Sequence, residues 1–161
     1  MLNFVQVNLK KAFIAAVELN KRLEGLEQYI ALITESYNFK GKIRSLPRGS
    51  RVISCQDCRA AIICSSGINL IKIEKLTRKD CAVGLLQINK EKILIVSVYL
   101  DIKEPVVQAW LNEVIQFAKK KKYSFIMGTD SNAHSALYGH ETNNRGEEME
   151  EFIINLSLIH I

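Results

Sequence analysis

The segment Gly128–Ser135, with the sequence GTDSNAHS, carries the residue types best suited to chemistry in this chain of 161 residues. It follows Tyr123–Met127, an apolar run typical of a buried strand. Asp130 and Asn132 therefore fall at the carboxyl end of a strand, where open α/β folds bind their ligands. In an extended segment, side chains two positions apart point to the same side. We thus expect this carboxylate and carboxamide to act together, on an attacking water or on a metal-bound phosphate.

Three more polar residues follow apolar runs earlier in the chain. Asn8 comes just after the alternating segment Phe4–Val7, Glu35 ends the continuous apolar run Tyr29–Thr34, and Tyr99 follows IVSV. Phosphodiester hydrolysis needs a cation on a phosphate oxygen, an oriented water for in-line attack and help for the departing oxygen. Glu35 offers the hard oxygen ligand that Mg²⁺ prefers, and Mn²⁺ accepts the same ligand. Asn8 could fix a carboxylate or a phosphate oxygen, and Tyr99 could offer its phenol to the phosphate.

The spacing of apolar residues predicts the elements that must position these side chains. Short apolar runs predict strands at residues 4–7, 29–34, 60–64, 68–73, 81–88, 93–100, 123–127 and 156–161. Apolar residues three and four positions apart predict helices at residues 11–28, 105–122 and 147–154.

The order of these elements predicts the fold class. The four runs between residues 60 and 100 follow one another without a helix, which predicts an antiparallel meander. Residues 36–59 contain Gly, Pro and basic residues without a sustained period and predict a long loop. Parallel crossovers and antiparallel pairs are thus mixed, and an α/β sandwich with sheets inside and helices outside fits them.

Composition limits the class of protein and its partners. With 48% hydrophobic residues the chain suits one globular domain with a sizeable core. A formal charge of +5 and an isoelectric point near 9.0 permit a polyanionic partner such as DNA without requiring one. No apolar run approaches the ~20 residues of a membrane span, and the first residues lack the apolar core of a signal peptide. We therefore expect an intracellular protein that does not enter membranes.

The four cysteines allow either a zinc site or buried thiols. Cys55 and Cys58 form one C-x2-C pair, but a zinc site would need all four thiolates or a nearby histidine. Cys64 and Cys81 lie in the apolar runs AAIIC and CAVGLL, where a free cysteine behaves as a small buried hydrophobe. We expect free thiols, since disulfides are rare in intracellular proteins.

The segment GTDSNAHS resembles the GDFNAH segment of the endonuclease/exonuclease/phosphatase superfamily, in the form found in the apurinic/apyrimidinic-endonuclease-like domains of non-long-terminal-repeat retrotransposons. Asn8 in QVNL, Glu35 in LITES and Tyr99 in VSVYL match the other motifs of that superfamily in the same order, and Asp130 and Asn132 match its Asp and Asn. The resemblance implies a four-layer α/β sandwich of two mixed sheets flanked by helices. It also implies a Mg²⁺-dependent endonuclease, with Glu35 at the metal and with Asn8, Tyr99, Asp130 and Asn132 as catalytic residues.

The residues around the motif resemble the retrotransposon branch in particular. Ala133-His134-Ser135 is followed by Tyr138-Gly139 and by Asn144-Arg145-Gly146. This branch implies nicking of target DNA for retrotransposition, a reverse transcriptase in the parent polyprotein, and a nuclear location for action on chromosomal DNA. A related phosphatase acting on small phosphoesters fits these residues less well.

Two departures from the family pattern lead to an alternative. Ser131 stands where the family usually has Phe. Family members also continue beyond the position of Ile161, with a further Asp and a Ser-Asp-His segment. We therefore expect residues 1–161 to be one endonuclease-like domain lacking its C-terminal part. The alternative is a catalytically inactive remnant that keeps the fold and weak nucleic-acid binding.

Three further residues are candidates for DNA contacts. His134 lies in a polar loop, where simple exposure is the other explanation. Arg48 belongs to the basic stretch of residues 36–59, which a solvated loop would also explain. Arg145 could contact DNA, or could cap or brace the loop that carries Asp130.

Overall fold

The computed structural model describes residues 1–136, 139 and 141–156. The elements in chain order are β1 (Leu2–Asn8), α1 (Phe13–Glu24), β2 (Gln28–Thr34), β3 (Asn38–Phe39), β4 (Lys42–Ile43), β5 (Arg51–Ile53), β6 (Ala60–Cys64), β7 (Leu70–Lys72), the 3-10 helix η1 (Glu74–Leu76), β8 (Cys81–Ile88), β9 (Glu91–Tyr99), α2 (Ala109–Lys121), β10 (Ser124–Asp130) and α3 (Asn144–Asn155). Of the strand predicted over residues 156–161, Leu156 follows the last turn of α3, and the rest lies outside the described residues.

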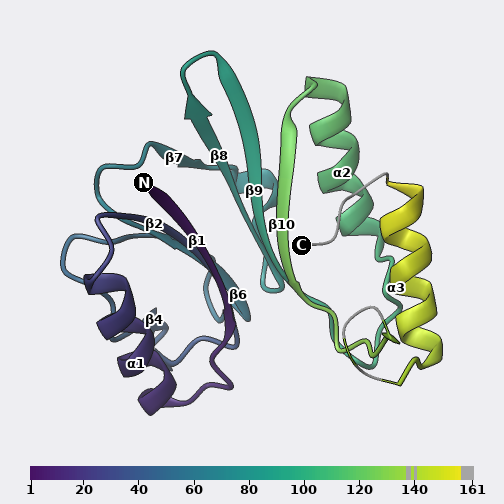
Figure 1. Cartoon of the computed structure of the whole chain (residues 1–161), viewed down its shortest axis with the longest axis horizontal. Coiled ribbons are helices and arrows are strands. Elements are labelled where there is room, and N and C mark those ends of the chain that lie inside the picture. The colour runs from purple at the N-terminus through teal and green to yellow at the C-terminus, as the bar shows by residue number, and fades with distance from the viewer. Residues whose placement is uncertain (137–138, 140, 157–161) are drawn as a thin grey trace.

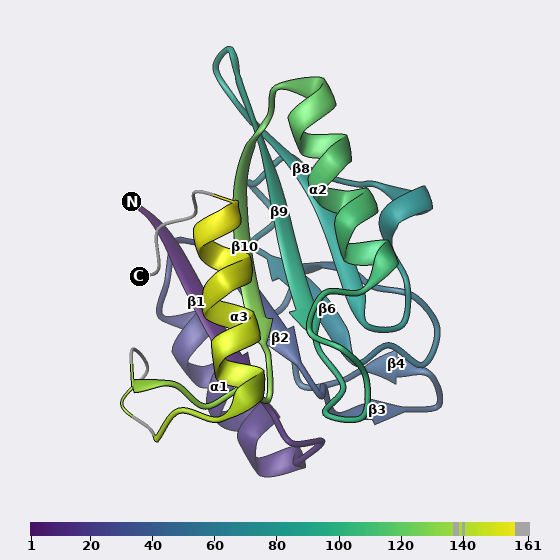
Figure 2. The ribbon, with the colours of Figure 1, turned by 90° about the vertical axis from the view of Figure 1, so that its right-hand side faces the viewer.

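Two four-stranded sheets pack face to face and are covered by helices on their outer faces (Figure 1 and Figure 2). The first sheet has the order β1-β2-β6-β5 and carries α1, and the second has the order β10-β9-β8-β7 and carries α2 and α3. Each sheet contains one parallel pair, β1 with β2 in the first and β9 with β10 in the second, because a helix connects the two strands of the pair. The remaining pairs in both sheets are antiparallel. These are the layers of the predicted mixed α/β sandwich.

Three clusters of buried side chains fill the spaces between the four layers. The cluster between the sheets contains Ile30, Leu32, Ile62 and Ile95. A second cluster packs α1 on the first sheet, and a third packs α2 and α3 on the second sheet. Full burial of each Leu or Ile contributes about 1.5–3 kcal/mol, so this packing holds the two sheets at a fixed separation.

Gly128 allows β10 to approach the first sheet closely. A Cβ at this position would lie 2.6 Å from the Leu32 Cδ1 of β2, nearer than packed carbon atoms come. Just beyond it, the Gln6 side chain of β1 donates a hydrogen bond of 2.7 Å to the Thr129 carbonyl oxygen. The ends of β1 and β10 therefore lie side by side although they belong to different sheets.

The prediction of a long loop over residues 36–59 is wrong in part. The segment contains a two-stranded hairpin, β3 with β4, and a third strand, β5, that pairs with β6. These strands are two or three residues long, too short to show a period in the sequence.

The predicted four-stranded meander is also only partly right. Strands β7, β8 and β9 form an antiparallel meander, but β6 lies in the other sheet between β2 and β5. All five residues of β6 are buried, so its composition fits an interior strand of either sheet.

Helices α1 and α2 are shorter than the helices predicted over residues 11–28 and 105–122. Helix α1 ends at Glu24, before Gly25, and α2 begins at Ala109 rather than at Pro105. Leu26 and Val106 continue the apolar spacing of these helices, yet they pack into the core from the adjoining loops. Apolar spacing alone therefore extended both predicted helices beyond their ends.

Candidate active site

Four strands end at one edge of the sandwich and bring the predicted site residues to it. Asn8 is the last residue of β1 and pairs with Thr34, so that Glu35 follows at the end of β2. Tyr99 ends β9 and pairs with Asp130, the last residue of β10. In each parallel pair the two carboxyl ends lie at the same edge of the sheet, and a hydrogen bond from Asn8 to Asp130 joins the edges of the two sheets.

The Asn8 carboxamide joins a carboxylate from each sheet. Its Nδ2 donates hydrogen bonds to Glu35 Oε2, at 2.9 Å, and to Asp130 Oδ2, at 2.5 Å. Its Oδ1 accepts a hydrogen bond of 2.7 Å from the backbone N–H of Lys10, which fixes the orientation of the amide. These three side chains, which are 27 and 122 residues apart along the chain, form the centre of the candidate site.

The backbone of Glu35 leaves the strand direction to reach Asn8. Its φ of 47° lies in the left-handed region, which is unusual for a residue other than glycine. Two hydrogen bonds of 2.7 Å hold it there, one from its N–H to the Arg59 carbonyl and one from the Lys11 N–H to its own carbonyl. Local strain of this kind is concentrated at functional sites, where the surroundings maintain it.

The loop after β10 differs from the extended segment that the sequence predicted. Asn132 has a φ of 49°, so it does not continue the alternation of β10. Its backbone N–H points to Asp130 Oδ1 at 3.4 Å, and its side-chain Nδ2 donates to the Leu100 carbonyl at 2.9 Å. Asn132 therefore supports Asp130 through its backbone and anchors the loop to the end of β9 through its side chain.

Arg59 is a residue of this region that the sequence analysis missed. It immediately precedes β6, and its guanidinium donates to Asp80 and to Asp101, the latter at 2.6 Å. The same guanidinium lies over the Tyr99 ring, 4.5 Å from its centre. Hydrogen bonds from Arg59 to Asp80 raise the pKa of the guanidinium, and Arg59 in turn lowers the pKa of Asp101. The sequence signals this clamp on Asp80 and Asp101 only by the position of Arg59 directly before the apolar run AAIIC.

The three residues proposed as DNA contacts occupy different surroundings. Arg145 donates to the carbonyl oxygens of Ser131, Glu104 and Asp101 at 2.5–2.9 Å. It therefore braces the loop after β10, which is the structural alternative to a DNA contact that the sequence analysis gave for it. His134 is exposed and pairs through its backbone with Asn143, the residue that caps α3. Arg48 is exposed in the segment between β4 and β5.

The cysteines are present as free thiols. All four are free, and Cys58, Cys64 and Cys81 are buried. Burial raises the pKa of the Cys81 thiol to about 12, so this thiol is inert near neutral pH. In the part of the chain that the structure describes, no helix is long and apolar enough to cross a membrane.

The oxygen ligands at the strand ends fit a divalent cation. Glu35 and Asp130 each accept a hydrogen bond from the Asn8 Nδ2. Neither carboxylate forms an ion pair with a basic residue within the described ranges. Among the described residues, no group of three or more His, Cys, Asp and Glu side chains is placed so that it could hold a metal ion together. Mg²⁺ is commonly bound through one or two carboxylates, with water and substrate phosphates as its other ligands. The two carboxylates present therefore suffice for Mg²⁺ and are too few for a closed all-protein cage.

Comparisons with known proteins agree with the fold. Residues 93–161 match a family model described as endonuclease-reverse transcriptase. The structure is similar to the endonuclease domain of TRAS1, a telomere-specific non-LTR retrotransposon, with a TM-score of 0.72 and 25% sequence identity over 95% of this chain and 69% of that one. It is also similar in fold to the AP endonuclease LMAP from Leishmania major, with a TM-score of 0.62 and 10% identity over 95% of this chain and 66% of that one. No curated protein matches the sequence significantly. The chain thus spans about two thirds of the length of both solved structures.

Proposed function

We propose that this chain, which belongs to the endonuclease/exonuclease/phosphatase superfamily and has the fold of a retrotransposon endonuclease, hydrolyses phosphodiester bonds of DNA with the help of Mg²⁺ or Mn²⁺. The observation that carries the proposal is the Asn8 bridge between Glu35 and Asp130. It holds two carboxylates from two sheets at a single point, where a cation and a phosphate can meet. The biological reaction would be the nicking of target DNA, in the nucleus where that DNA is chromosomal, for a reverse transcriptase of the same polyprotein.

Each residue of the site would have a separate role in hydrolysis. Glu35 would hold the cation, which when bound neutralises a nonbridging phosphate oxygen. Asp130, whose Oδ2 is fixed by Asn8, would accept the proton of the attacking water as the new oxygen–phosphorus bond forms and the opposite phosphorus–oxygen bond breaks, and the departing oxygen would take a proton from solvent. Tyr99, whose ring lies against the Arg59 guanidinium, would donate a hydrogen bond from its phenolic hydroxyl to a phosphate oxygen. Asn8 and Asn132 fix Asp130 from both sides and so reduce the reorganisation that the reaction requires.

One observation favours a second candidate function. The described residues gather two carboxylates and no histidine around Asn8. A site with so few titratable groups offers hydrolysis no imidazole to protonate the departing oxygen. This candidate is a catalytically inactive domain that keeps the fold and binds DNA weakly.

Nicking of supercoiled plasmid in the presence of Mg²⁺ tests both candidates. We expect the wild-type chain to nick, and Glu35→Gln to reduce the rate about 100-fold or more, since it removes the charge that holds the cation. Glu91→Gln, an equal change at the exposed start of β9, serves as the matched control and should leave the rate unchanged.

The outcomes separate the two candidates. EDTA should stop nicking, and Mn²⁺ should restore it. Equal rates for Glu35→Gln and the wild-type chain would refute the proposed role of Glu35. DNA binding without nicking in either metal would support the second candidate instead.

A further inference from the structure

The hairpin that follows Glu35 is built to project into solvent. Strands β3 and β4 pair through Asn38 with Ile43 and Phe39 with Lys42, and the Arg44 N–H donates to the Tyr37 carbonyl at 3.2 Å. The two turn residues, Lys40 and Gly41, have φ values of 52° and 73°. Both values are positive, as in the tight turns that best match the twist of two antiparallel strands. Residues 37–44 thus form a compact hairpin without a third strand.

This hairpin exposes an aromatic ring between cations. Phe39 is 50% exposed, and the Lys40 ammonium and the Arg44 guanidinium lie 5.6 and 5.9 Å from the centre of its ring. At the base of the hairpin, Tyr37 meets the ring of Phe13 edge to face at 5.3 Å, and Phe13 is itself 54% exposed. Folding gains little from rings left half in water, so their exposure calls for another reason.

The charge of the segment favours a polyanion. Residues 37–52 contain five basic residues and no acidic one. Arg51 is used internally, because it donates to the carbonyls of Ile68 and Leu70. In the described part of the chain, no ion pair involves Lys40, Lys42 or Arg44. These three cations therefore remain for a partner.

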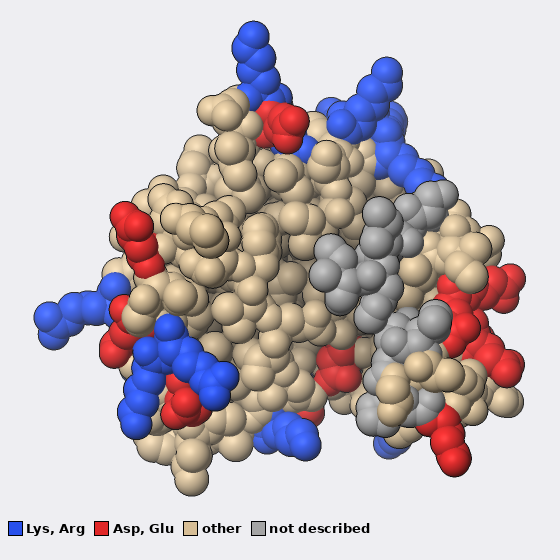
Figure 3. Space-filling model, viewed as in Figure 1, with Lys and Arg blue, Asp and Glu red and all other residues tan. Residues whose placement is uncertain are grey.

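Acidic residues are concentrated elsewhere. Helix α3 carries Glu147, Glu148, Glu150 and Glu151, and Figure 3 shows the red side chains gathered over it on the right of the molecule. The face of α3 would repel a polyanion, whereas the hairpin lies beyond the other sheet, on the side of α1 (Figure 1).

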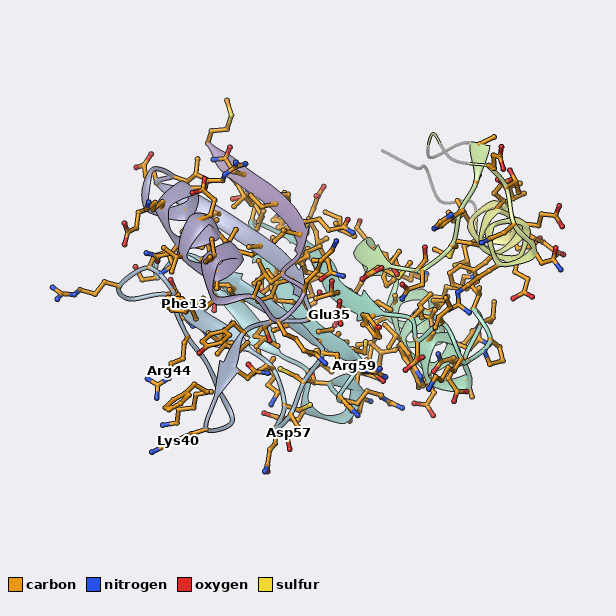
Figure 4. All side chains as sticks on the ribbon, turned by 90° about the horizontal axis from the view of Figure 1, so that it is seen from below. Phe13, Glu35, Lys40, Arg44, Asp57 and Arg59 are labelled. Atoms are coloured by element: carbon orange, nitrogen blue, oxygen red, sulfur yellow. The ribbon has the colours of Figure 1, made fainter. Side chains whose placement is uncertain are left out.

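The hairpin is directly connected to the candidate active site. Tyr37 is two residues and Phe39 four residues from Glu35, so the Cα atom of Phe39 lies within about 14 Å of that of Glu35. Phe13 follows Lys10 and Lys11, whose N–H groups bind Asn8 and Glu35. Figure 4, a view from below, shows Glu35 near the middle of the molecule, with Phe13, Lys40 and Arg44 together to its left. A DNA strand held at Glu35 would reach the hairpin within a few nucleotides, at about 3.4 Å for each base step.

We propose that the hairpin of residues 37–44, together with Phe13, is a second DNA contact that binds unpaired bases beside the nicking site. Phe39 stacks on a base that has left the duplex, and Lys40, Lys42 and Arg44 hold the adjacent phosphates. A paired base offers no free face to such a ring, so the contact gives the protein a preference for DNA that is locally open. The inference rests on the proposed function, since it takes DNA at the site of Asn8, Glu35 and Asp130 as its premise.

Binding without cleavage provides the test. Fluorescence anisotropy in EDTA compares a labelled 30-base-pair duplex with the same duplex carrying three unpaired positions at its centre. Phe39→Ala removes the ring, Phe39→Leu keeps apolar bulk without an aromatic face, and Phe39→Trp keeps the face. Ile88→Ala is the control, since Ile88 is 42% exposed at the β8–β9 hairpin on the opposite end of the molecule (Figure 1).

The expected pattern is specific to stacking. Phe39→Ala and Phe39→Leu should each weaken binding of the opened DNA about 5- to 100-fold, with little change for the closed duplex, while Phe39→Trp and Ile88→Ala should bind as the wild-type chain does. Lys40→Ala with Lys42→Ala should lower the slope of log affinity against log salt by about 1.5, and Lys90→Ala with Lys92→Ala, the matched control, should not.

Failure of this inference is distinguishable from failure of the proposed function. If the Phe39 variants bind both DNAs like the wild-type chain while the wild-type chain still nicks plasmid, the inference is wrong and the proposed function stands. If the wild-type chain neither binds nor nicks any DNA, the proposed function is wrong and the inference falls with it.

Discussion

Replacement of Asn8 by Asp changes one NH₂ group into an oxygen and tests the bridge at the centre of the site. The Asn8 Nδ2 lies 2.9 Å from Glu35 Oε2 and 2.5 Å from Asp130 Oδ2. In Asn8→Asp, an oxygen of similar size would take this position. Two hydrogen bonds would then become two contacts between acceptors, and three carboxylates would meet at one point.

The expected loss of stability follows from the charges. Two unit charges 4 Å apart repel each other by about 4 kcal/mol at an effective dielectric constant of 20 and by about 1 kcal/mol in water. Because all three side chains are only half-buried, we take about 1 kcal/mol for each of the two new pairs. Asn8→Ala removes the same hydrogen bonds without adding a charge. The Asp variant should therefore be about 2 kcal/mol less stable than the Ala variant near neutral pH.

The sign of the pH dependence distinguishes charge from packing. The neighbouring carboxylates would raise the pKa of the introduced carboxyl in the folded protein above its unfolded value of about 3.9. Between these two pKa values the folded state binds more protons than the unfolded state, so stability falls as pH rises. The deficit relative to Asn8→Ala should thus be largest above pH 7 and should shrink towards pH 4.

Urea unfolding of both variants between pH 4.5 and 8, with and without Mg²⁺, measures this difference. Mg²⁺ should stabilise Asn8→Asp more than Asn8→Ala, because a cation relieves the repulsion among three carboxylates. Equal stabilities of the two variants at every pH, with no separate effect of Mg²⁺, would refute the assignment of Asn8 as the bridge between Glu35 and Asp130.

Three further predictions concern the surroundings of the site. Arg59→Lys keeps the charge but loses the paired hydrogen bonds to Asp80 and Asp101, so we expect about 1–2 kcal/mol less stability in urea unfolding and slower plasmid nicking with unchanged DNA affinity; an unchanged nicking rate would argue against a positioning role. Asp101→Asn should destabilise the protein at pH 7 but not at acid pH, because a lowered pKa in the folded state gives stability that is lost as pH falls through that value; melts between pH 2.5 and 7 check this. Gly146→Ala should cost about 2 kcal/mol or more in thermal unfolding, since its Cβ would collide with the His134 carbonyl oxygen, and a neutral result would mean that the loop after β10 yields easily.

The sequence predicts most of the candidate site because the site lies at strand ends. Apolar runs locate the ends of β1, β2, β9 and β10 to within three residues, and each parallel crossover places the two ends of its own pair side by side. Asn8 therefore lies beside Glu35, and Tyr99 lies beside Asp130. The contact between Asn8 and Asp130 also requires the two sheets to pack with these edges together, because β1 and β10 belong to different sheets.

Contacts that depend on pairing between distant segments could not be predicted. The assignment of β6 to the first sheet depends on partners 30 residues away, in β2, and its five apolar residues fit either sheet. The left-handed backbone of Glu35 and Asn132 is fixed by hydrogen bonds to Arg59 and to Asp130, and neither residue type signals it. Arg59 was missed for the same reason, because its two carboxylate partners lie 21 and 42 residues further along the chain.

Two neighbouring clusters show why a neutral residue at position 8 matters for function. Arg59 holds Asp80 and Asp101, and its positive charge offsets half of theirs, so that this cluster is a structural clamp. Asn8 likewise holds two carboxylates, Glu35 and Asp130, through one hydrogen bond to each, but it contributes no charge. Two negative charges therefore remain at the strand ends, and their mutual repulsion is the condition that a divalent cation relieves on binding. Because one of these carboxylates belongs to each sheet, their separation is set by the apolar packing between the sheets, including the close approach of Gly128 to Leu32.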